Sequence, residues 1–318
     1  MKRITAYILL IAMISIFALA SCDRVTDERP YVIGTVFPQY DFARQIGGED
    51  IRCEMLLPPG ADSHGYTGDD PSDVYRIMNC DVFIYVGGET DSDWVGKIKT
   101  RLSGEEHKPI FISMCDVCET IEEDEGAVIE KEEHEEEHHE GERDEHVWTS
   151  PKNAVLISEA IKDALCETDP ANADKYGERF ESYKSELLSL DKEFRELSEK
   201  TDNKTLVFAD RFPFRYFANE YGYRCFAAFN GCASQSEPTP TTIVELCRII
   251  NENSLPCVYY IETSHSGVPE LICKNTGCEK LLLHSCHTIT ERELKDGATY
   301  LSLMRRNLEN LKKAENNG

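Results

Sequence analysis

Basic residues are scarce in this chain. Lys and Arg total 34 against 59 Asp and Glu, which gives a formal net charge of −25 over 318 residues. Such an acidic balance argues against nucleic acid and against anionic membrane surfaces as partners. The sequence beyond residue 20 also lacks any apolar run long enough to span a bilayer. What remains is a length that suits one large or two medium domains with a sizeable core.

The N-terminus has the pattern of a secretory signal. Lys2 and Arg3 precede an almost uncharged apolar run at residues 4–20, which leads into Ser21-Cys22. A cysteine directly after Leu-Ala-Ser resembles a bacterial lipobox and predicts that Cys22 is lipidated, although a plain signal or an anchor helix is an alternative. Acyl chains attach a protein to a membrane because each buried CH₂ contributes about 0.8 kcal/mol. We therefore expect a signal segment at residues 1–22 and a chain anchored by lipid at the extracytoplasmic face of the cell membrane.

Thirteen cysteines are present, Cys22 among them. Outside the cytosol they can form disulfides, but their spacing is not that of a small stapled domain. Cys115-x-x-Cys118 has no matching second pair, so a metal or redox use is the less favoured interpretation. Cys247 and Cys257 lie in apolar surroundings, which is typical of small core residues. The sequence does not give the connectivity of any disulfide.

Short apolar runs alternate with helical patterns in two parts of the chain. In the first part, strands are expected at 30–36, from 53, at 80–86 and at 107–114, with helices at 41–47, from 71 and at 150–165. In the second part, strands are expected at 205–210, 257–262 and 280–286, with helices at 214–222, 239–253, 267–277 and 299–315. Alternation of this kind implies a parallel sheet covered by helices in each part.

A long charged helix is expected between the two parts. Residues 170–200 carry apolar side chains at spacings of three or four along most of the segment, at Tyr176, Phe180, Tyr183, Leu187, Leu190 and Phe194. A helix of about 30 residues spans about 45 Å, more than the width of one small domain. The expected fold class is therefore α/β, with two Rossmann-like lobes (23–168 and 201–318), parallel sheets, and one long backbone helix (169–200) that joins the lobes.

An acidic insertion interrupts the first part at residues 119–145. It holds fifteen Asp or Glu against two basic residues and is expected to be disordered or loosely ordered. His134, Glu135 and His138 spell H-E-x-x-H, a zinc protease motif when it lies on a packed helix. No apolar side chain lies between Ile129 and Val147, so such a helix could not dock on a core and an enzyme is not expected. His134, His138 and His139 suit a low-affinity zinc collector, and a passive solvated loop is the alternative.

Other histidines follow strands or precede a helix. His64 lies in a Pro-Gly loop after a strand, His146 lies just before a helix start, and His284 and His287 follow a buried strand. Open α/β sheets bind ligands beyond the carboxyl ends of their strands, so these histidines are expected to converge on one cleft. Imidazole suits zinc and other late divalent metals. Each histidine alone could equally cap a loop.

Two segments carry a resemblance to a known family. "LLPPGADSHGYTGDDPSD" (56–73) and "DEHVWTSPKNAV" (144–155) resemble ligand segments of the zinc and manganese solute-binding lipoproteins of ABC transporters, the cluster A-I family. The resemblance extends from Tyr31 to Lys313 and preserves order and spacing. It implies that His64 and His146 are metal ligands.

The chain departs from the family pattern at the third and fourth ligands. Arg211 stands in the usual third position, and its guanidinium cannot coordinate a cation, so the neighbouring Asp210 is a possible substitute. The fourth position, normally a carboxylate, is taken by "HSCH", which makes His284 and His287 plausible replacements. Cys286 between them could be a thiolate ligand or a disulfide partner, for example of Cys232. Glu262 at a strand end is a further candidate.

The resemblance implies a receptor that binds Zn²⁺ between the lobes and delivers it to an ABC permease and its ATPase. A histidine-rich ligand set favours zinc over manganese, which prefers carboxylates. A manganese receptor of the same family and an extracellular zinc buffer without transport are the alternatives. The long helix is expected to keep the relative motion of the lobes small.

Overall fold

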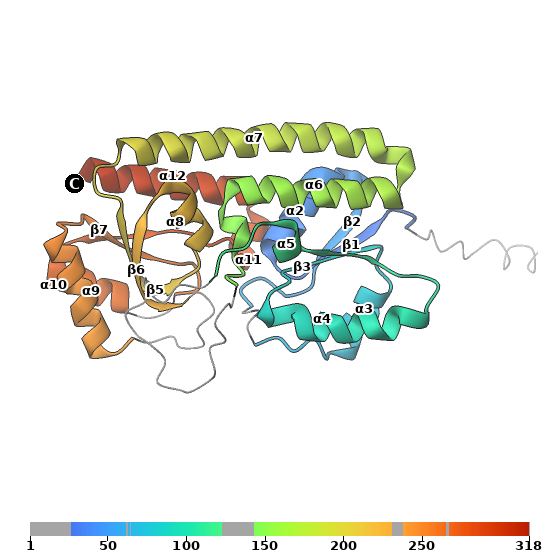
Figure 1. Cartoon of the computed structure of the whole chain (residues 1–318), viewed down its shortest axis with the longest axis horizontal. Helices are drawn as coiled ribbons and strands as arrows, with labels where there is room; N and C mark the ends of the chain where they lie inside the picture. The colour runs from blue at the N-terminus through green and yellow to red at the C-terminus, as the bar shows by residue number, and fades with distance from the viewer. Residues whose placement is uncertain are drawn as a thin grey trace, which may run out of the picture.

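The computed structural model describes residues 27–61, 63, 65–122, 143–230, 238–264 and 267–317. Its strands form two parallel sheets (Figure 1). The first has the order β2-β1-β3-β4 and contains β1 (Tyr31–Gly34), β2 (Arg52–Met55), β3 (Val82–Tyr85) and β4 (Ile110–Ser113). The second has the order β6-β5-β7-β8 and contains β5 (Thr205–Phe212), β6 (Arg224–Asn230), β7 (Cys257–Tyr260) and β8 (Glu279–Leu282). The two sheets thus share one topology, and the α/β fold class predicted from the sequence is confirmed.

Helices cover both faces of each sheet. In the N-terminal lobe they are α2 (Phe37–Gly47), α3 (Pro71–Met78), α4 (Glu89–Arg101), α5 (Met114–Val117) and α6 (Pro151–Thr168). In the C-terminal lobe they are α8 (Arg215–Tyr221), α9 (Pro240–Glu252), α10 (Val268–Thr276), α11 (Glu291–Lys295) and α12 (Tyr300–Asn317). Several begin where the sequence predicts, because a polar side chain caps a first turn that opens with proline, as Asp70 does for α3 and Thr239 for α9.

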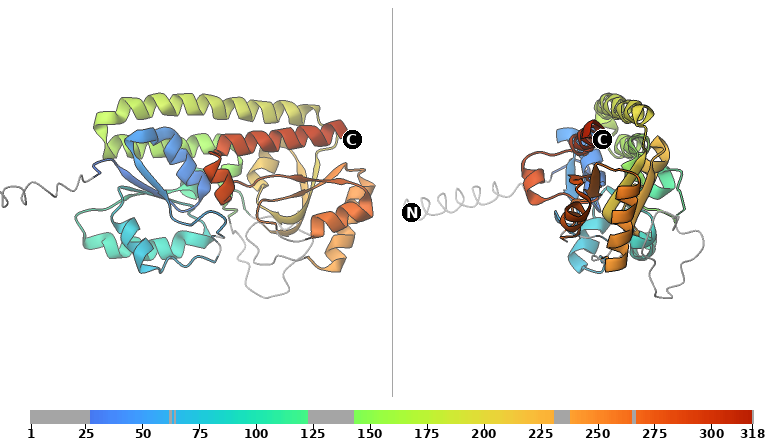
Figure 2. Two further views of the ribbon diagram at one scale, coloured as in Figure 1. Left: turned by 180° about the vertical axis from the view of Figure 1, so that it is seen from behind. Right: turned by 90° about the vertical axis from the view of Figure 1, so that its left-hand side faces the viewer.

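The long helix α7 (Ala173–Lys200) lies along both lobes, and Figure 2 shows the same arrangement from behind. It packs against α2 and α6 of the N-terminal lobe and α12 of the C-terminal lobe. The six apolar residues that predicted this helix are all buried. They form one stripe because residues three or four apart lie on the same face of a helix. The expected backbone helix is therefore confirmed.

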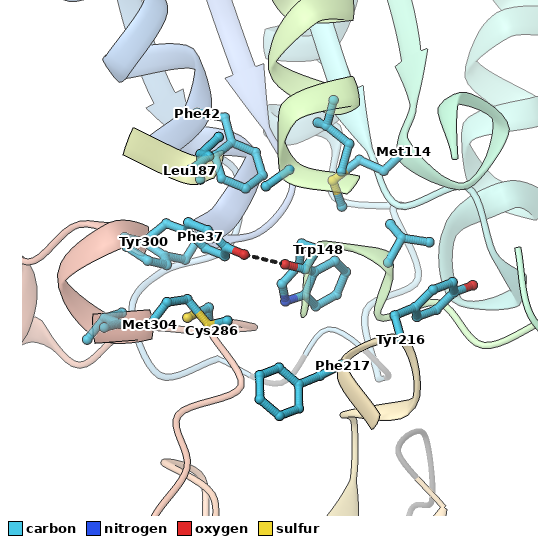
Figure 3. Packing of buried hydrophobic residues seen from close by; sticks show 14 of the residues in the cluster. Phe37, Phe42, Met114, Trp148, Leu187, Tyr216, Phe217, Cys286, Tyr300 and Met304 are labelled. Atoms are coloured by element: carbon cyan, nitrogen blue, oxygen red, sulfur yellow. Dashed lines mark hydrogen bonds between the residues drawn. The ribbon is translucent and has the colours of Figure 1, made fainter. Parts of the chain in front are cut away.

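The two lobes share one hydrophobic core. Successive strand residues point to opposite faces, so Val32 of β1 belongs to the shared core while Ile33 packs under α3 and α4. In β5, Phe208 likewise belongs to the shared core while Val207 packs against α9 and α10. Figure 3 shows the junction, where side chains from both lobes surround Trp148. The lobes are therefore joined by packed side chains as well as by α7.

Both ends of the acidic segment 119–145 make defined contacts. Glu122 and Arg143 form an antiparallel bridge, and the backbone N–H of Asp144 donates to Ile121 O at 2.9 Å. Asp144 and Glu145 are buried. Glu145 accepts a hydrogen bond from the Thr90 N–H at 2.7 Å and thereby satisfies a first-turn donor of α4. Asp144 and Glu145 are thus part of the folded structure, because donors from other residues offset the cost of burying each carboxylate.

Two segments that carry predictions are not among the described residues. Residues 123–142, with His134, His138 and His139, and residues 1–26, with the lipidation site Cys22, lie outside the described residues. Across the described part of the chain, no helix is long and apolar enough to cross a bilayer.

Candidate functional site: a histidine pair between the lobes

His146 and His287 meet where the two lobes join. Their ring centroids lie 5.6 Å apart with an interplanar angle of 80°. The indole of Trp148 contacts both rings, at centroid distances of 5.4 Å and 5.3 Å. His146 directly precedes the 3-10 turn η4 (Val147–Thr149) of the N-terminal lobe, whereas His287 belongs to the segment after β8. The structure therefore brings together two predicted ligands from different lobes.

Asp144 fixes the orientation of His146. Its Oδ1 accepts the backbone N–H of His146 at 2.8 Å and lies 3.3 Å from the His146 Nδ1. The other oxygen lies 3.5 Å from the Nε of Arg215, so the buried carboxylate has a cationic neighbour. A histidine whose Nδ1–H donates to a carboxylate presents the lone pair of Nε2, which is the arrangement that metal-binding histidines use.

Trp148 ties the two lobes together beside the histidines. Its Nε1–H donates to Ser285 O at 2.9 Å, and its backbone carbonyl accepts the Tyr300 hydroxyl at 2.7 Å (Figure 3). The side chain is only 1% exposed. A buried indole that donates its single hydrogen bond across the junction fixes the spacing of the two segments.

His287 is held by contacts within its own turn and to two other segments. Its backbone N–H donates to the Ser285 hydroxyl oxygen at 3.1 Å, and its carbonyl accepts the Phe37 N–H at 3.4 Å. Glu262 accepts both the N–H and the hydroxyl of Ser285, at 2.8 Å and 2.6 Å, and so supports the same turn. The His287 Nε2 lies 2.6 Å from Ser63 Oγ, and Ser63 immediately precedes His64 in the sequence.

His284 lies in a different environment from His287. Its ring is fully buried, its Nδ1 accepts the N–H of Cys286 at 3.0 Å, and its Nε2 lies 3.7 Å from Glu293 Oε2. His284 first, and then Arg306, lower the pKa of Glu293 by stabilising its carboxylate. The two nitrogens of the His284 ring therefore face Glu262 and Glu293 rather than the histidine pair.

Asp210 and Arg211 occupy an irregular part of β5. The register against β6 shifts between Phe208 and Arg211. The Asp210 carboxylate is largely buried and accepts the Arg211 N–H at 2.8 Å. Such irregularities re-aim side chains near functional sites, which is compatible with the predicted substitution of Asp210 for Arg211 as a ligand.

The predicted ligand set extends beyond what the structure describes. His64 lies outside the described residues, as does Cys232. Where residues are described, no group of three or more His, Cys, Asp or Glu side chains is placed to hold a metal. Cys286 is buried there as a free thiol. Of the predicted ligands, the structure thus places the pair His146 and His287 in ring contact.

Sequence reasoning missed three contributors to this site: Asp144, Trp148 and Ser63. By composition Asp144 belongs to the acidic run, although a carboxylate two residues before a candidate ligand histidine is a usable signal. Trp148 and Ser63 had no signal beyond their proximity in sequence to His146 and His64.

Comparisons with known proteins identify relatives of the chain. The chain is 29% identical over 317 residues to the zinc-binding lipoprotein AdcA of Streptococcus pneumoniae, which covers 98% of the chain and 61% of that relative. It is 26% identical over 290 residues to the high-affinity zinc uptake system protein ZnuA of Bacillus subtilis, covering 90% and 87%.

A solved structure, the Zn(II)-bound ZnuA-like domain of Streptococcus pneumoniae AdcA, matches with a TM-score of 0.71 and 26% identity, covering 90% of this chain and 99% of that one. The family model described as zinc-uptake complex component A, periplasmic, matches residues 32–314. The resemblance found in the sequence is confirmed: the chain belongs to this zinc-uptake component A family.

Proposed function

We propose that the chain is the extracytoplasmic receptor of an ABC uptake transporter, binding Zn²⁺ between its lobes and delivering it to the membrane permease. The observation that carries the proposal is the ring contact between His146 and His287, one from each lobe. Two imidazoles at this distance, one oriented by a buried carboxylate, suit a late divalent metal. The names of the relatives, which are zinc-binding and zinc-uptake proteins, support zinc as the cargo.

His64 is proposed as a ligand beside His146 and His287. Ser63 Oγ contacts the His287 Nε2, and the Gly60 N–H donates to Thr288 Oγ1 at 2.9 Å, so the loop that leads to His64 rests on the histidine segment of the other lobe. Asp210 and His284 are the proposed candidates for the one remaining ligand. A closed shell of four protein ligands suits a carrier, because transport requires no metal-bound water for hydrolysis.

The anchor and the loop complete the proposal. Lipidation at Cys22 would hold the chain beside its permease, as a lipid chain attaches an otherwise water-exposed protein to a bilayer. His134, His138 and His139 would collect zinc weakly from solution and raise its local concentration near the cleft.

A competitive zinc titration with native mass spectrometry on the full chain tests the ligand assignment. We expect His146→Ala, His287→Ala and His64→Ala each to weaken zinc binding by more than about tenfold. His107→Ala is a matched control, because His107 contacts Cys80 O at 2.8 Å and belongs to the N-terminal lobe alone. Tight zinc binding in all three ligand variants would refute the site.

Two further arms separate the alternatives. A parallel manganese titration tests the manganese receptor, which requires manganese to bind more tightly than zinc. Zinc uptake by cells that lack the chain tests the buffer. If the chain is a transport receptor, supplying the wild-type chain to these cells restores zinc uptake and supplying His146→Ala does not. If it is a buffer, neither chain changes uptake.

A further inference from the structure

Four cysteines gather in the part of the C-terminal lobe formed by α9, α10, β7 and β8, separate from the histidine pair. They are Cys247, Cys257, Cys273 and Cys278. Cys273 and Cys278 are in contact, with 3.8 Å between the two Sγ atoms. Both residues are half-buried, so solvent and small reagents reach them. In the described part of this lobe the pair is not completed to a metal-binding set of three, which leaves thiol chemistry as its possible use.

The end of α10 brings the two thiols together. Gly277 adopts a left-handed conformation with φ of 80°, and its N–H donates to Cys273 O at 2.8 Å. In this type of helix cap the chain turns back, so that the residue after the glycine meets the residue four positions before the glycine. Those two positions usually hold an apolar contact, and here they hold Cys278 and Cys273.

We propose that Cys273 and Cys278 are joined by a disulfide in the exported protein. The Sγ atoms lie 3.8 Å apart and a disulfide holds them at about 2.05 Å, so the two side chains would rotate toward each other. The inference rests on the export that the proposed function includes, because disulfides persist outside the cytosol and are reduced within it.

The oxidant is a second disulfide, either of a thiol oxidase or of a small organic molecule. One cysteine of the pair attacks that disulfide as a thiolate, forms a mixed disulfide and releases one thiol. The other cysteine then attacks the mixed disulfide, closes the Cys273–Cys278 bond and releases the second thiol. Both cysteine protons end on the released thiols, and the two electrons lost by the cysteines reduce the oxidant.

The bond would constrain the entry to β8. Cys278 directly precedes Glu279, the first residue of this edge strand, and the strand leads at its other end to His284 and His287. The disulfide would therefore fasten the end of α10 to the start of the strand that carries the histidine segment. An edge strand has a sheet neighbour on one side only, so the disulfide would give β8 a further attachment.

The position of Lys274 makes the bond directly measurable. Trypsin cleaves after Arg248, Lys274 and Lys280, so a disulfide would hold peptide 249–274 to peptide 275–280. The full chain is alkylated in intact cells, purified and digested without reductant. We expect the linked pair, and we expect a reductant to separate it into its two peptides. Recovery of both peptides already alkylated would overturn the proposal.

A matched pair of variants identifies the partner of Cys278, because peptide 249–274 also contains Cys257. The linked peptides should disappear in Cys273→Ala and persist in Cys257→Ala. The reverse result would overturn the assignment, and thermal unfolding of both variants shows whether each is folded. Zinc titration of the same samples separates the two ideas. A chain that binds zinc with alkylated Cys273 and Cys278 refutes the disulfide only, and a linked chain that does not bind zinc refutes the receptor only.

Discussion

At the scale of single residues, the candidate site depends on Asp144, a carboxylate whose role could not be predicted because its neighbours in the sequence are also acidic. The sequence predicted His146 and His287, because histidines beside strand ends and helix starts stand out in a chain with nine of them. Asp144 did not stand out, because acidic residues fill the segment before it. Its burial and its contacts with His146 and Arg215 identify it as part of the site. Composition describes a segment, whereas the role of a residue depends on its contacts.

We predict that Asp144→Asn weakens zinc binding by roughly 10–100-fold, the usual cost of losing a group that orients a metal ligand. The amide can present its NH₂ toward the imidazole and no longer enforces a donor at Nδ1. Competitive titration measures the change. Asp41→Asn is the matched control, because Asp41 is equally buried and accepts the Tyr300 N–H at 2.8 Å. Wild-type zinc affinity in Asp144→Asn would contradict the orienting role.

At the scale of elements, regular patterns were predictable and weak ones were not. The stripe of α7 and the capped starts of α3, α6 and α9 follow from spacing and from proline. Helix α4 has a glycine near its centre and only three buried apolar residues. Its apolar pattern is therefore too short to indicate a helix from the sequence. Strand β6 reads Arg-Cys-Phe-Ala-Ala-Phe-Asn, without the β-branched residues that mark strands, and it forms because β5 offers a free edge.

The acidic insertion allows a test that keeps the fold intact. We predict that deleting residues 123–142 and joining Glu122 to Arg143 through a short Gly-Ser linker preserves tight zinc binding. Only weakly bound zinc ions should be lost. The bridge between Glu122 and Arg143 already brings the ends together, so the loop closes at little entropic cost. Native mass spectrometry at excess zinc gives the number of weakly bound zinc ions. Unchanged weak binding would exclude the collector role of His134, His138 and His139.

At the scale of the whole molecule, two lobes with one topology do not behave as two independent bodies. Each sheet has its own small core on one face, beneath α3 and α4 or beneath α9 and α10. The opposite faces of both sheets contribute to one continuous core with α2, α6, α7, α8 and α12. A hinge opening would have to break this core, and close-packed interiors resist such deformation. The sequence indicated restricted motion through the long helix, but the shared core is a property of the folded chain alone.

We therefore predict that X-ray scattering profiles of the wild-type chain with and without zinc superimpose, and that Trp148→Ala separates them. Trp148 packs between the lobes and donates across the junction to Ser285, so its loss should cost roughly 3–5 kcal/mol and loosen the junction. Trp94→Ala is the matched control, since the other tryptophan packs against Phe83 within the N-terminal lobe. It should lower stability by a similar amount without making the profile depend on zinc. A zinc-dependent contraction of the wild-type chain, or of Trp94→Ala alone, would show that the shared core does not hold the lobes at a fixed angle.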